Sequence, residues 1–315
     1  MEPQKILIVG GAGYIGGYLT DYLAKEHSVT VYDCLMYEDR FLKNIEFING
    51  NVLEEQKLKK IINNYDCVIW LAAIVGDGAC TVDPYLTNKI NYECLRWIPE
   101  IYKGKFIFAS TCSVYGINSG LINENSKTNP LSMYASTKLK AEQYITQNIK
   151  NHLIFRLGTL FGMGDLFSRI RLDLVANILT YKASIGEELN VFGGEQWRPL
   201  LHVKDVATAI SNGIKNDIRG VYNLAYKNFT IKEIAENIKE AIPNTKIIYQ
   251  DVPFEDLRNY KVENVKYTKT GWTPRYNLQG SIKEMNKIFI EKRIANPNNP
   301  VYHNHFYLKS IWNKI

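Results

Sequence analysis

The sequence lacks the features of membrane, secreted and nucleic-acid-binding chains. No apolar run among its 315 residues reaches the ~18 that a membrane span needs, and its first residues lack a signal-peptide layout. The five cysteines are odd in number and include no CxxC pair. They predict reduced thiols in a cytoplasmic protein and disfavour a disulfide framework or a zinc site. The net charge of +6 contains no block of like charge, so no nucleic-acid partner is expected.

Two histidines near the end, His303 and His305, are too few for a metal site, and we expect no bound metal. No internal repeat or low-complexity segment is present. A mildly basic chain of this size more often handles a small anionic substrate. Its length allows one α/β domain with a smaller appended lobe.

Short apolar runs alternate with amphipathic stretches, which predicts an α/β fold with a doubly wound parallel Rossmann sheet. Ligands of such folds bind at the carboxyl edge of the sheet. The expected strands are Lys5–Val9, 28–32, Glu46–Asn49, Cys67–Trp70, 105–109 and 153–157. The expected helices are 15–25, 55–63, 84–102 and 131–148.

After Gly162 the pattern becomes less regular and predicts a smaller mixed α/β lobe. We expect an NAD-binding Rossmann domain over residues 1–162 and a substrate-binding lobe over residues 163–315, partly interleaved with it. Expected strands are 190–192, 200–203, 221–224 and 246–249, and expected helices are 171–184, 204–215 and Ile231–Ala241. The aromatic-rich end, residues 296–315, is expected to be a turn followed by a docking segment.

A glycine-rich turn, Gly10-Gly-Ala-Gly13-Tyr-Ile-Gly16, lies between an expected strand and an expected helix, the context in which this motif binds a dinucleotide. Gly10 allows the tight turn, Gly13 lets the backbone approach the pyrophosphate, and Gly16 permits close packing of the helix. Amides at the helix N-terminus favour the pyrophosphate charge. About 20 residues further on, Asp33 can accept from both ribose hydroxyls, which favours NAD over NADP. The alternative is a glycine turn without a ligand.

Tyr134 and Lys138 lie four residues apart, so on a helix they share a face. A tyrosine with an ordinary pKa near ~10 is a poor base at neutral pH. We expect the Lys138 ammonium, together with an oxidised nicotinamide, to lower the pKa of the phenol. Tyr134 can then take a hydroxyl proton while hydride leaves the same carbon. Thr111, after the strand 105–109, is expected to orient that hydroxyl. The alternative is a chance YxxxK match on an exposed helix face.

Together these motifs resemble the extended short-chain dehydrogenase/reductase family, in its nucleotide-sugar epimerase/dehydratase branch. The resemblance extends from Lys5 to about Pro274 and is specific for the family but not for the sugar. It includes the glycine turn, LAA at 71–73, STCSVYG at 110–116, YASTK at 134–138, RLGTLFG at 156–162, GGEQWRPLLHVKD at 193–205 and GWTP at 271–274. It implies NAD as cofactor and a GDP- or UDP-linked sugar as substrate.

Position by position, the resemblance implies a catalytic trio of Thr111, Tyr134 and Lys138. It implies cofactor contacts at Gly10, Gly13, Tyr14, Ile15, Gly16, Asp33, Asn51, Val52, Leu71, Ala72, Ala73 and Lys138. It implies substrate contacts at Thr111, Ser113, Thr159, Asn177, Arg198 and Arg258. The last three fall where relatives hold the diphosphate, and the planar fork of arginine suits phosphate. A surface ion pair is the alternative reading of each arginine.

Several departures from the family pattern narrow the reaction. Sugar 4,6-dehydratases of the family carry an Asp-Glu pair where this chain has Cys112 and Ser113, so dehydration is disfavoured. We interpret Cys112 as a small buried thiol. Thr159 stands where many 4-epimerases have asparagine, and Asn51 replaces an aspartate near adenine. The segment 168–177 resembles a subgroup of sugar-modifying oxidoreductases, some of which act on GDP-heptose in capsule synthesis.

The resemblance leads us to expect NAD-dependent oxidation at C4 of a nucleotide-sugar, such as GDP-heptose, to a 4-keto sugar. A 4-epimerase uses the same half-reaction and is the alternative; a 4,6-dehydratase or a non-catalytic NAD-binding scaffold is disfavoured. Relatives dimerise through a four-helix bundle of the helices expected at 84–102 and 131–148, which implies a homodimer. Leu95, Ile98 and Ile145 could lie in that interface or in the core.

Overall fold

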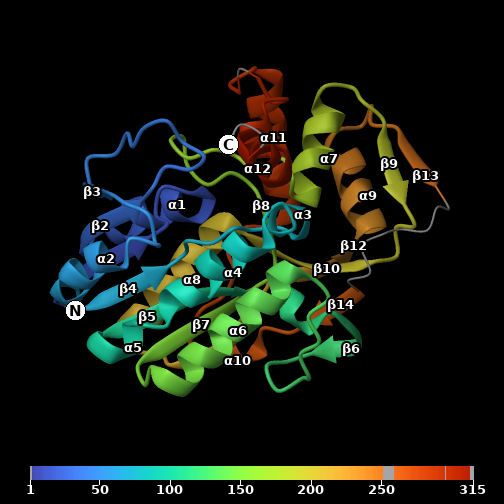
Figure 1. Ribbon diagram of the computed structural model, residues 1–315. Helices are drawn as coiled ribbons and strands as arrows, with labels where there is room; N and C mark the ends of the chain where they lie inside the picture. Colours follow the sequence, from blue (N-terminus) through green and yellow to red (C-terminus); the bar gives the residue numbers. More distant parts are fainter. Residues whose placement is uncertain (1, 251–258, 295, 313–315) are drawn as a thin grey trace.

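One seven-stranded parallel sheet forms the centre of the protein (Figure 1). The computed structural model describes residues 2–250, 259–294 and 296–312. The strand order is β11-β7-β5-β4-β1-β2-β3, and every neighbouring pair is parallel. The six strands expected before residue 162 all lie in this sheet and are confirmed. The strands are β1 (Lys5–Val9), β2 (Ser28–Asp33), β3 (Glu46–Asn49), β4 (Cys67–Trp70), β5 (Lys105–Thr111), β7 (His152–Leu157) and β11 (Gly220–Leu224).

Helices cover both faces of the sheet because both faces of its strands are apolar. Ile6 and Ile8 pack on one side with residues of α1 (Tyr14–Leu23) and α8 (Val203–Lys215). Leu7 and Val9 point to the other side. There they pack with residues of α2 (Glu55–Ile61), α4 (Pro84–Asn91) and α6 (Met133–Asn148). This is the doubly wound arrangement that the apolar runs predicted.

The expected helix over 84–102 is wrong as a single element. The structure has α4, then a 3-10 turn η2 (Glu93–Leu95), then the short α5 (Ile98–Ile101). Tyr92 leaves the helical region with φ −135° and ψ −58°, and Pro99 cannot donate the hydrogen bond that a continuing helix needs. Leu95, Ile98 and Ile145 are all buried in the core, so these three residues do not form an exposed dimer face in this protomer.

The chain after β7 builds the smaller lobe and also returns to the main sheet. Although they follow residue 162, α8 packs on α1 and β11 pairs with β7. The division at residue 162 remains a prediction. The lobe contains α7 (Val175–Ser184), α9 (Ile231–Ala241) and α11 (Leu278–Ile290), whereas the short α10 (Val265–Thr268) packs against β11 of the main sheet. In one small sheet, β10 (Trp197–His202) lies between β8 (Thr159–Phe161) and β12 (Lys227–Thr230). Two further sheets each have two strands: β9 (Leu189–Phe192) with β13 (Ile247–Gln250), and β6 (Ile117–Ile122) with β14 (Asn259–Val262).

The helix expected over 171–184 begins four residues later, at Val175. Residues 171–173 instead form a turn in which Arg171 and Asp173 pair with each other. Side chains two residues apart lie on different faces of a helix, so this pairing requires a non-helical backbone. The turn therefore presents both charged groups on the same side.

The C-terminal segment is docked on the rest of the protein. A 3-10 turn η4 (Pro300–Tyr302) leads into α12 (Asn304–Trp312), which packs against the short α3 (Asp77–Cys80). Leu308 of α12 is buried in the core beside the sheet. In the part of the chain that the structure describes, no helix has the length and apolar character to cross a membrane.

Candidate active site

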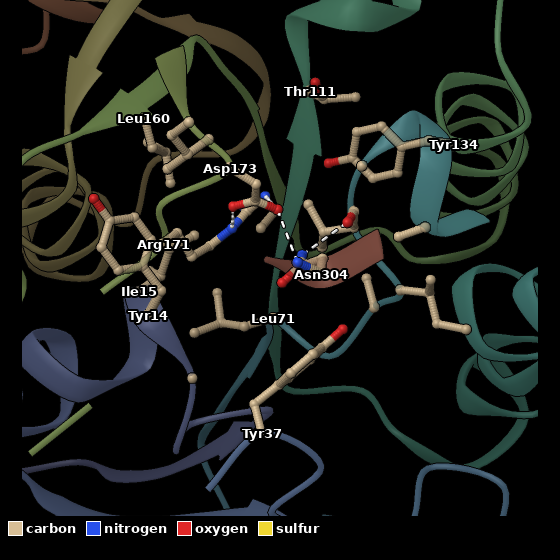
Figure 2. A pocket seen from close by; sticks show the side chains of 18 of the residues that line it. Tyr14, Ile15, Tyr37, Leu71, Thr111, Tyr134, Leu160, Arg171, Asp173 and Asn304 are labelled. Carbon is tan, nitrogen blue, oxygen red and sulfur yellow. Dashed lines mark hydrogen bonds and ion pairs between the residues drawn. The ribbon is translucent and has the colours of Figure 1, made fainter. Parts of the chain in front are cut away.

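A large cavity of about 700 Å³ lies at the carboxyl ends of the parallel strands (Figure 2). Residues that follow β1, β2, β4, β5 and β7 line it on one side, and the smaller lobe lines it on the other. The lining includes most of the site residues expected from the sequence: Gly10, Gly13, Tyr14, Ile15, Gly16, Asp33, Asn51, Val52, Leu71, Ala72, Ala73, Thr111, Ser113, Tyr134, Lys138, Thr159 and Arg198. Their individual roles remain predictions.

The glycine turn has the shape that a dinucleotide needs. Gly10 has φ +82°, and a Cβ there would lie 2.4 Å from the Ala72 amide nitrogen. A Cβ on Gly16 would lie 2.4 Å from the Gly11 carbonyl oxygen, so only glycine allows this approach. A Cβ on Gly13 would meet only one protein atom, the Gly10 oxygen at 3.7 Å. The turn therefore leaves room at Gly13, beside the N-terminus of α1, where a pyrophosphate can approach the backbone.

Asp33 lies at the end of β2 and faces this cavity. Its carboxylate accepts hydrogen bonds from the Ala12 amide at 3.0 Å and the Leu35 amide at 2.8 Å. Burial raises the pKa of Asp33, while these backbone donors lower it. A carboxylate has about four acceptor positions, so two remain for ribose hydroxyls. Asn51 caps the next turn by accepting from the Leu53 amide at 2.9 Å.

Tyr134 and Thr111 come together at the other end of the cavity. Ser132 accepts from the Ala135 amide and so caps α6, which carries Tyr134 at its second position. The Tyr134 hydroxyl points into the cavity on the side where Thr111 lies (Figure 2), and Thr111 is one of the groups that lower the pKa of the phenol. Thr111 also accepts from the Ser113 amide at 3.1 Å, which fixes its rotamer. The pair is arranged to hold and deprotonate a hydroxyl.

The expected lowering of the phenol pKa by Lys138 together with an oxidised nicotinamide remains a prediction. Burial raises the pKa of Tyr134 above its ordinary range, and the groups that oppose this rise are Arg171 and Thr111. Lys138 is only 2% exposed, and its ammonium lies 3.9 Å from the centre of the Phe108 ring. Burial lowers the pKa of Lys138 to about 7. Desolvation acts on both groups and favours the neutral form of each.

Asn177 does not reach the cavity, contrary to its expected contact with a diphosphate. It is fully buried, and its amide oxygen accepts from the Gly162 amide at 2.9 Å. Its amide nitrogen donates to the Tyr14 hydroxyl and to the Arg171 carbonyl. The side chain therefore ties α7 to the loops around the cavity. Arg258, the other expected diphosphate ligand, lies outside the described residues.

Arg198 and Thr159 lie on neighbouring strands of the smaller lobe. Arg198 is on β10 and Thr159 on β8, which pairs with it in parallel. Both line the cavity, and Arg198 donates to the Trp197 carbonyl at 2.9 Å. An arginine and a hydroxyl at one end of a cavity suit a phosphorylated ligand.

Cys112 is confirmed as a small buried thiol. It is 1% exposed and donates to the Arg156 carbonyl at 3.2 Å, and burial raises the pKa of the thiol. A neutral thiol held by a backbone carbonyl is a poor substitute for the acidic residue of a dehydratase.

Sequence reasoning missed a group of polar residues that also line the cavity. They are Tyr37, Arg169, Arg171, Asp173, Asn304 and His305. The available signals were the resemblance of segment 168–177 to a subgroup of sugar-modifying oxidoreductases and the alternation of charge in residues 169–173, which does not fit the helix expected from residue 171. The tail residues gave no signal, because only the folded chain brings residue 304 beside residue 173.

The fold and the cavity define a Rossmann-fold, dinucleotide-dependent oxidoreductase. The model of the NAD-dependent epimerase/dehydratase family matches residues 6–225. The chain is 27% identical to the UDP-glucose 4-epimerase of Rhizobium meliloti over 88% of this chain and 94% of that one. It is 26% identical to the UDP-N-acetyl-alpha-D-glucosaminuronate decarboxylase of Bacillus cytotoxicus over 84% of this chain and 88% of that one.

Among solved structures, it resembles the UDP-glucuronic acid 4-epimerase of Bacillus cereus in complex with UDP-glucuronic acid and NAD. The TM-score is 0.77 with 25% identity, over 92% of this chain and 99% of that one. The chain therefore belongs to the NAD-dependent epimerase/dehydratase family. It is an NAD-dependent enzyme of the nucleotide-sugar epimerase/dehydratase type, and NAD is its cofactor.

Proposed function

We propose that the protein oxidises C4 of a nucleotide-activated sugar to a 4-keto sugar, with GDP-heptose or a related nucleotide-sugar as substrate. The observation that supports this most directly is one cavity lined by both the glycine turn and the Tyr134 and Thr111 side chains. NAD, when bound, supplies the hydride acceptor. The glycine turn and Asp33 are the groups that would hold it.

Tyr134 is the base of this proposal, and Thr111 orients the C4 hydroxyl. The hydroxyl proton passes to the Tyr134 oxygen while the hydrogen on C4 leaves as hydride with both electrons of the C4–H bond. C4 thereby loses two electrons and becomes a ketone. Burial opposes the phenolate that accepts this proton, whereas Arg171 and Thr111 favour it. The fraction of Tyr134 in the phenolate form therefore depends on the positive charges that lie near the phenol when NAD and substrate are bound.

On the substrate side, Arg198 would hold the diphosphate, and Ser113 and Thr159 would contact the sugar. All three line the cavity. Arg258 keeps its place in the proposal as a second diphosphate ligand. Asn177 does not, because its amide is already bonded within the protein.

A 4-epimerase is the second candidate. It shares the first half-reaction, and a relative of that name matches nearly the whole chain. The two differ in whether the ketone leaves or is reduced on its other face. Incubation of the purified enzyme with NAD and matched GDP- and UDP-sugars, followed by NMR of the products, separates them. A 4-keto sugar with an equal amount of NADH supports the dehydrogenase, and a C4-inverted sugar without ketone contradicts it.

A reducing, cytoplasmic location and a homodimer complete the proposal. All five cysteines are free thiols, which suits a reducing compartment. We propose that the dimer forms through α4 and α6, which pack side by side on one face of the sheet. Tyr85 of α4 is 69% exposed there.

A further inference from the structure

The cavity has a wall that comes partly from the C-terminal tail. We call it the tail wall and define it as Arg169, Arg171 and Asp173, from the loop before α7, with Asn304 and His305 of α12. All five residues line the cavity. Figure 2 shows Asp173 between Arg171 and Asn304, with Tyr134 on the same cavity.

Asn304 holds this wall together. Asn304 is 3% exposed, and its backbone N–H donates to the Asp173 carboxylate at 3.1 Å. Its side-chain oxygen accepts from Arg169. Two further bonds join the same loop to the tail, from the Leu172 amide to the Tyr302 carbonyl at 2.9 Å and from Arg169 to the Val301 carbonyl at 2.6 Å. The loop and the tail thus form one hydrogen-bonded unit.

The tail wall is connected to the helix that carries Tyr134. The Asn304 side chain donates to the Val75 carbonyl at 2.8 Å, and His305 Nδ1 lies 2.8 Å from the Gly78 oxygen. Between these two contacts, Asp77 accepts from Ser132 at 2.6 Å, the residue that caps α6. The wall therefore reaches the reacting end of the cavity, and its Arg171 also lies near Tyr14 and Ile15 of the glycine turn (Figure 2).

The two arginines of this wall already use most of their donor groups within the protein. Asp173 accepts two bonds of 3.0 Å from the Nε and Nη2 atoms of Arg171. Both terminal nitrogens of Arg169 donate to the tail, and Glu38 accepts from the Arg169 amide at 2.7 Å. Only Arg171 is paired with a carboxylate, whereas the Arg169 guanidinium bonds two neutral oxygens of the tail and its Nε is buried, so neither arginine has a free bidentate edge. A carboxylate on a ligand needs a bidentate cation for itself, whereas a sugar hydroxyl can both donate to Asp173 and accept from an arginine.

We propose that the tail wall binds the sugar ring of the substrate and selects an uncharged, hydroxylated sugar over a uronate. This rests on the proposed oxidation of a nucleotide-sugar and narrows its substrate class. It contrasts with the relatives named for glucosaminuronate and glucuronic acid. The C-terminal tail is thus a specificity-determining part of the active site.

The first test uses the unaltered enzyme. Turnover of UDP-glucose is compared with that of UDP-glucuronate, and GDP-mannose with GDP-mannuronate, so that only the charge at C6 differs. We expect kcat/KM to be at least about 100-fold lower for the uronate of whichever pair is turned over, because its carboxylate would be left without a cation. Equal or faster turnover of the uronate overturns the proposal.

The second test changes the wall. Asp173→Asn removes one carboxylate, and we expect it to shift the preference toward the uronate by about tenfold or more. Asn304→Ala, which detaches the tail, should raise KM for the neutral sugar by about tenfold while the Kd for NAD stays within twofold. Lys309→Ala, on the exposed side of α12, is the matched control and should change neither. Weaker NAD binding with an unchanged KM would assign the wall to the cofactor and refute the proposal.

Calorimetry separates this inference from the proposed reaction. If none of these nucleotide-sugars is turned over, the proposed oxidation fails, but the binding of UDP-glucose and UDP-glucuronate can still be compared. Tighter binding of the neutral sugar supports the tail wall, and equal binding or tighter binding of the uronate contradicts it. Thermal unfolding of each variant shows whether a lost activity reflects a lost fold.

Discussion

Burial shifts the two ionisable groups of the Tyr134–Lys138 pair in opposite directions. It raises the pKa of the phenol and lowers that of the ammonium to about 7. Both shifts favour the neutral form, because a low-dielectric site penalises charge of either sign. The motif reveals which groups take part, but their protonation depends on surroundings that the motif does not contain.

The phenolic oxygen of Tyr134 is the atom on which the proposed chemistry depends. We expect Tyr134→Phe to retain the fold and NAD binding and to lower kcat by ~10²–10⁴-fold, the usual contribution of a positioned base. Stopped-flow measurement of hydride transfer gives the rate directly. Tyr85→Phe, at an exposed tyrosine of α4, is the control. Undiminished turnover in Tyr134→Phe would falsify the assignment of the base.

Lys138 should make the stability of the protein depend on pH. Its pKa is about 7 when folded and near 10.4 when unfolded, so between these values the unfolded chain binds a proton that the folded chain lacks. Stability from this residue therefore rises with pH from 7 toward 9.5, by at most about 1.4 kcal/mol per unit. We expect Lys138→Met to lack this slope in urea unfolding. The same slope in both proteins would contradict a neutral buried lysine.

At the scale of elements, two glycines of one turn have separable roles. A Cβ on Gly13 meets only one oxygen at 3.7 Å, whereas a Cβ on Gly16 meets the Gly11 backbone at 2.4 Å. We expect Gly13→Ala to keep stability within about 0.5 kcal/mol but to weaken NAD binding tenfold or more. Gly16→Ala should lower stability by about 1–3 kcal/mol. Urea unfolding and NAD titration of both variants test this, and equal effects of the two changes would refute it.

The segment 168–174 shows where reading single elements fails. Its residues are compatible with the start of α7, but Leu172 donates to Tyr302 and Asp173 accepts from Asn304. Those bonds join residues about 130 positions apart, and local helix propensity cannot anticipate them. The consequence for function is that two arginines and a carboxylate face the cavity from a turn.

The proposed homodimer concerns the protein as a whole and can be tested by its mass in solution. We expect sedimentation to give about twice the 36.2 kDa of one chain. Tyr85→Glu, on the exposed face of α4, should shift it toward the mass of one chain, because it buries a charge in the proposed interface. Tyr249→Glu, at an exposed tyrosine of β13 in the smaller lobe, is the control. A monomer at all concentrations would rule out the dimer.

Six of the seven strands of the main sheet, the cofactor turn and the Tyr134–Lys138 pair could be placed from the sequence. These depend on short-range patterns, because apolar runs specify buried parallel strands and glycine spacing specifies the turn. Lys5–Val9, Gly10 to Gly16, Asp33 and Tyr134 could all be found in this way.

The surroundings of the glycine turn, Asp33 and Tyr134 depend on the tertiary fold and do not follow from these short patterns. The tertiary fold turned the Asn177 amide inward, put Lys138 over Phe108, and closed the cavity with Arg171, Asp173 and Asn304. The physical reason is that burial, pKa and long-range hydrogen bonds depend on every segment packed around a site. In this protein one of those segments is the C-terminal tail, more than 100 residues further along the chain than the loop that it holds.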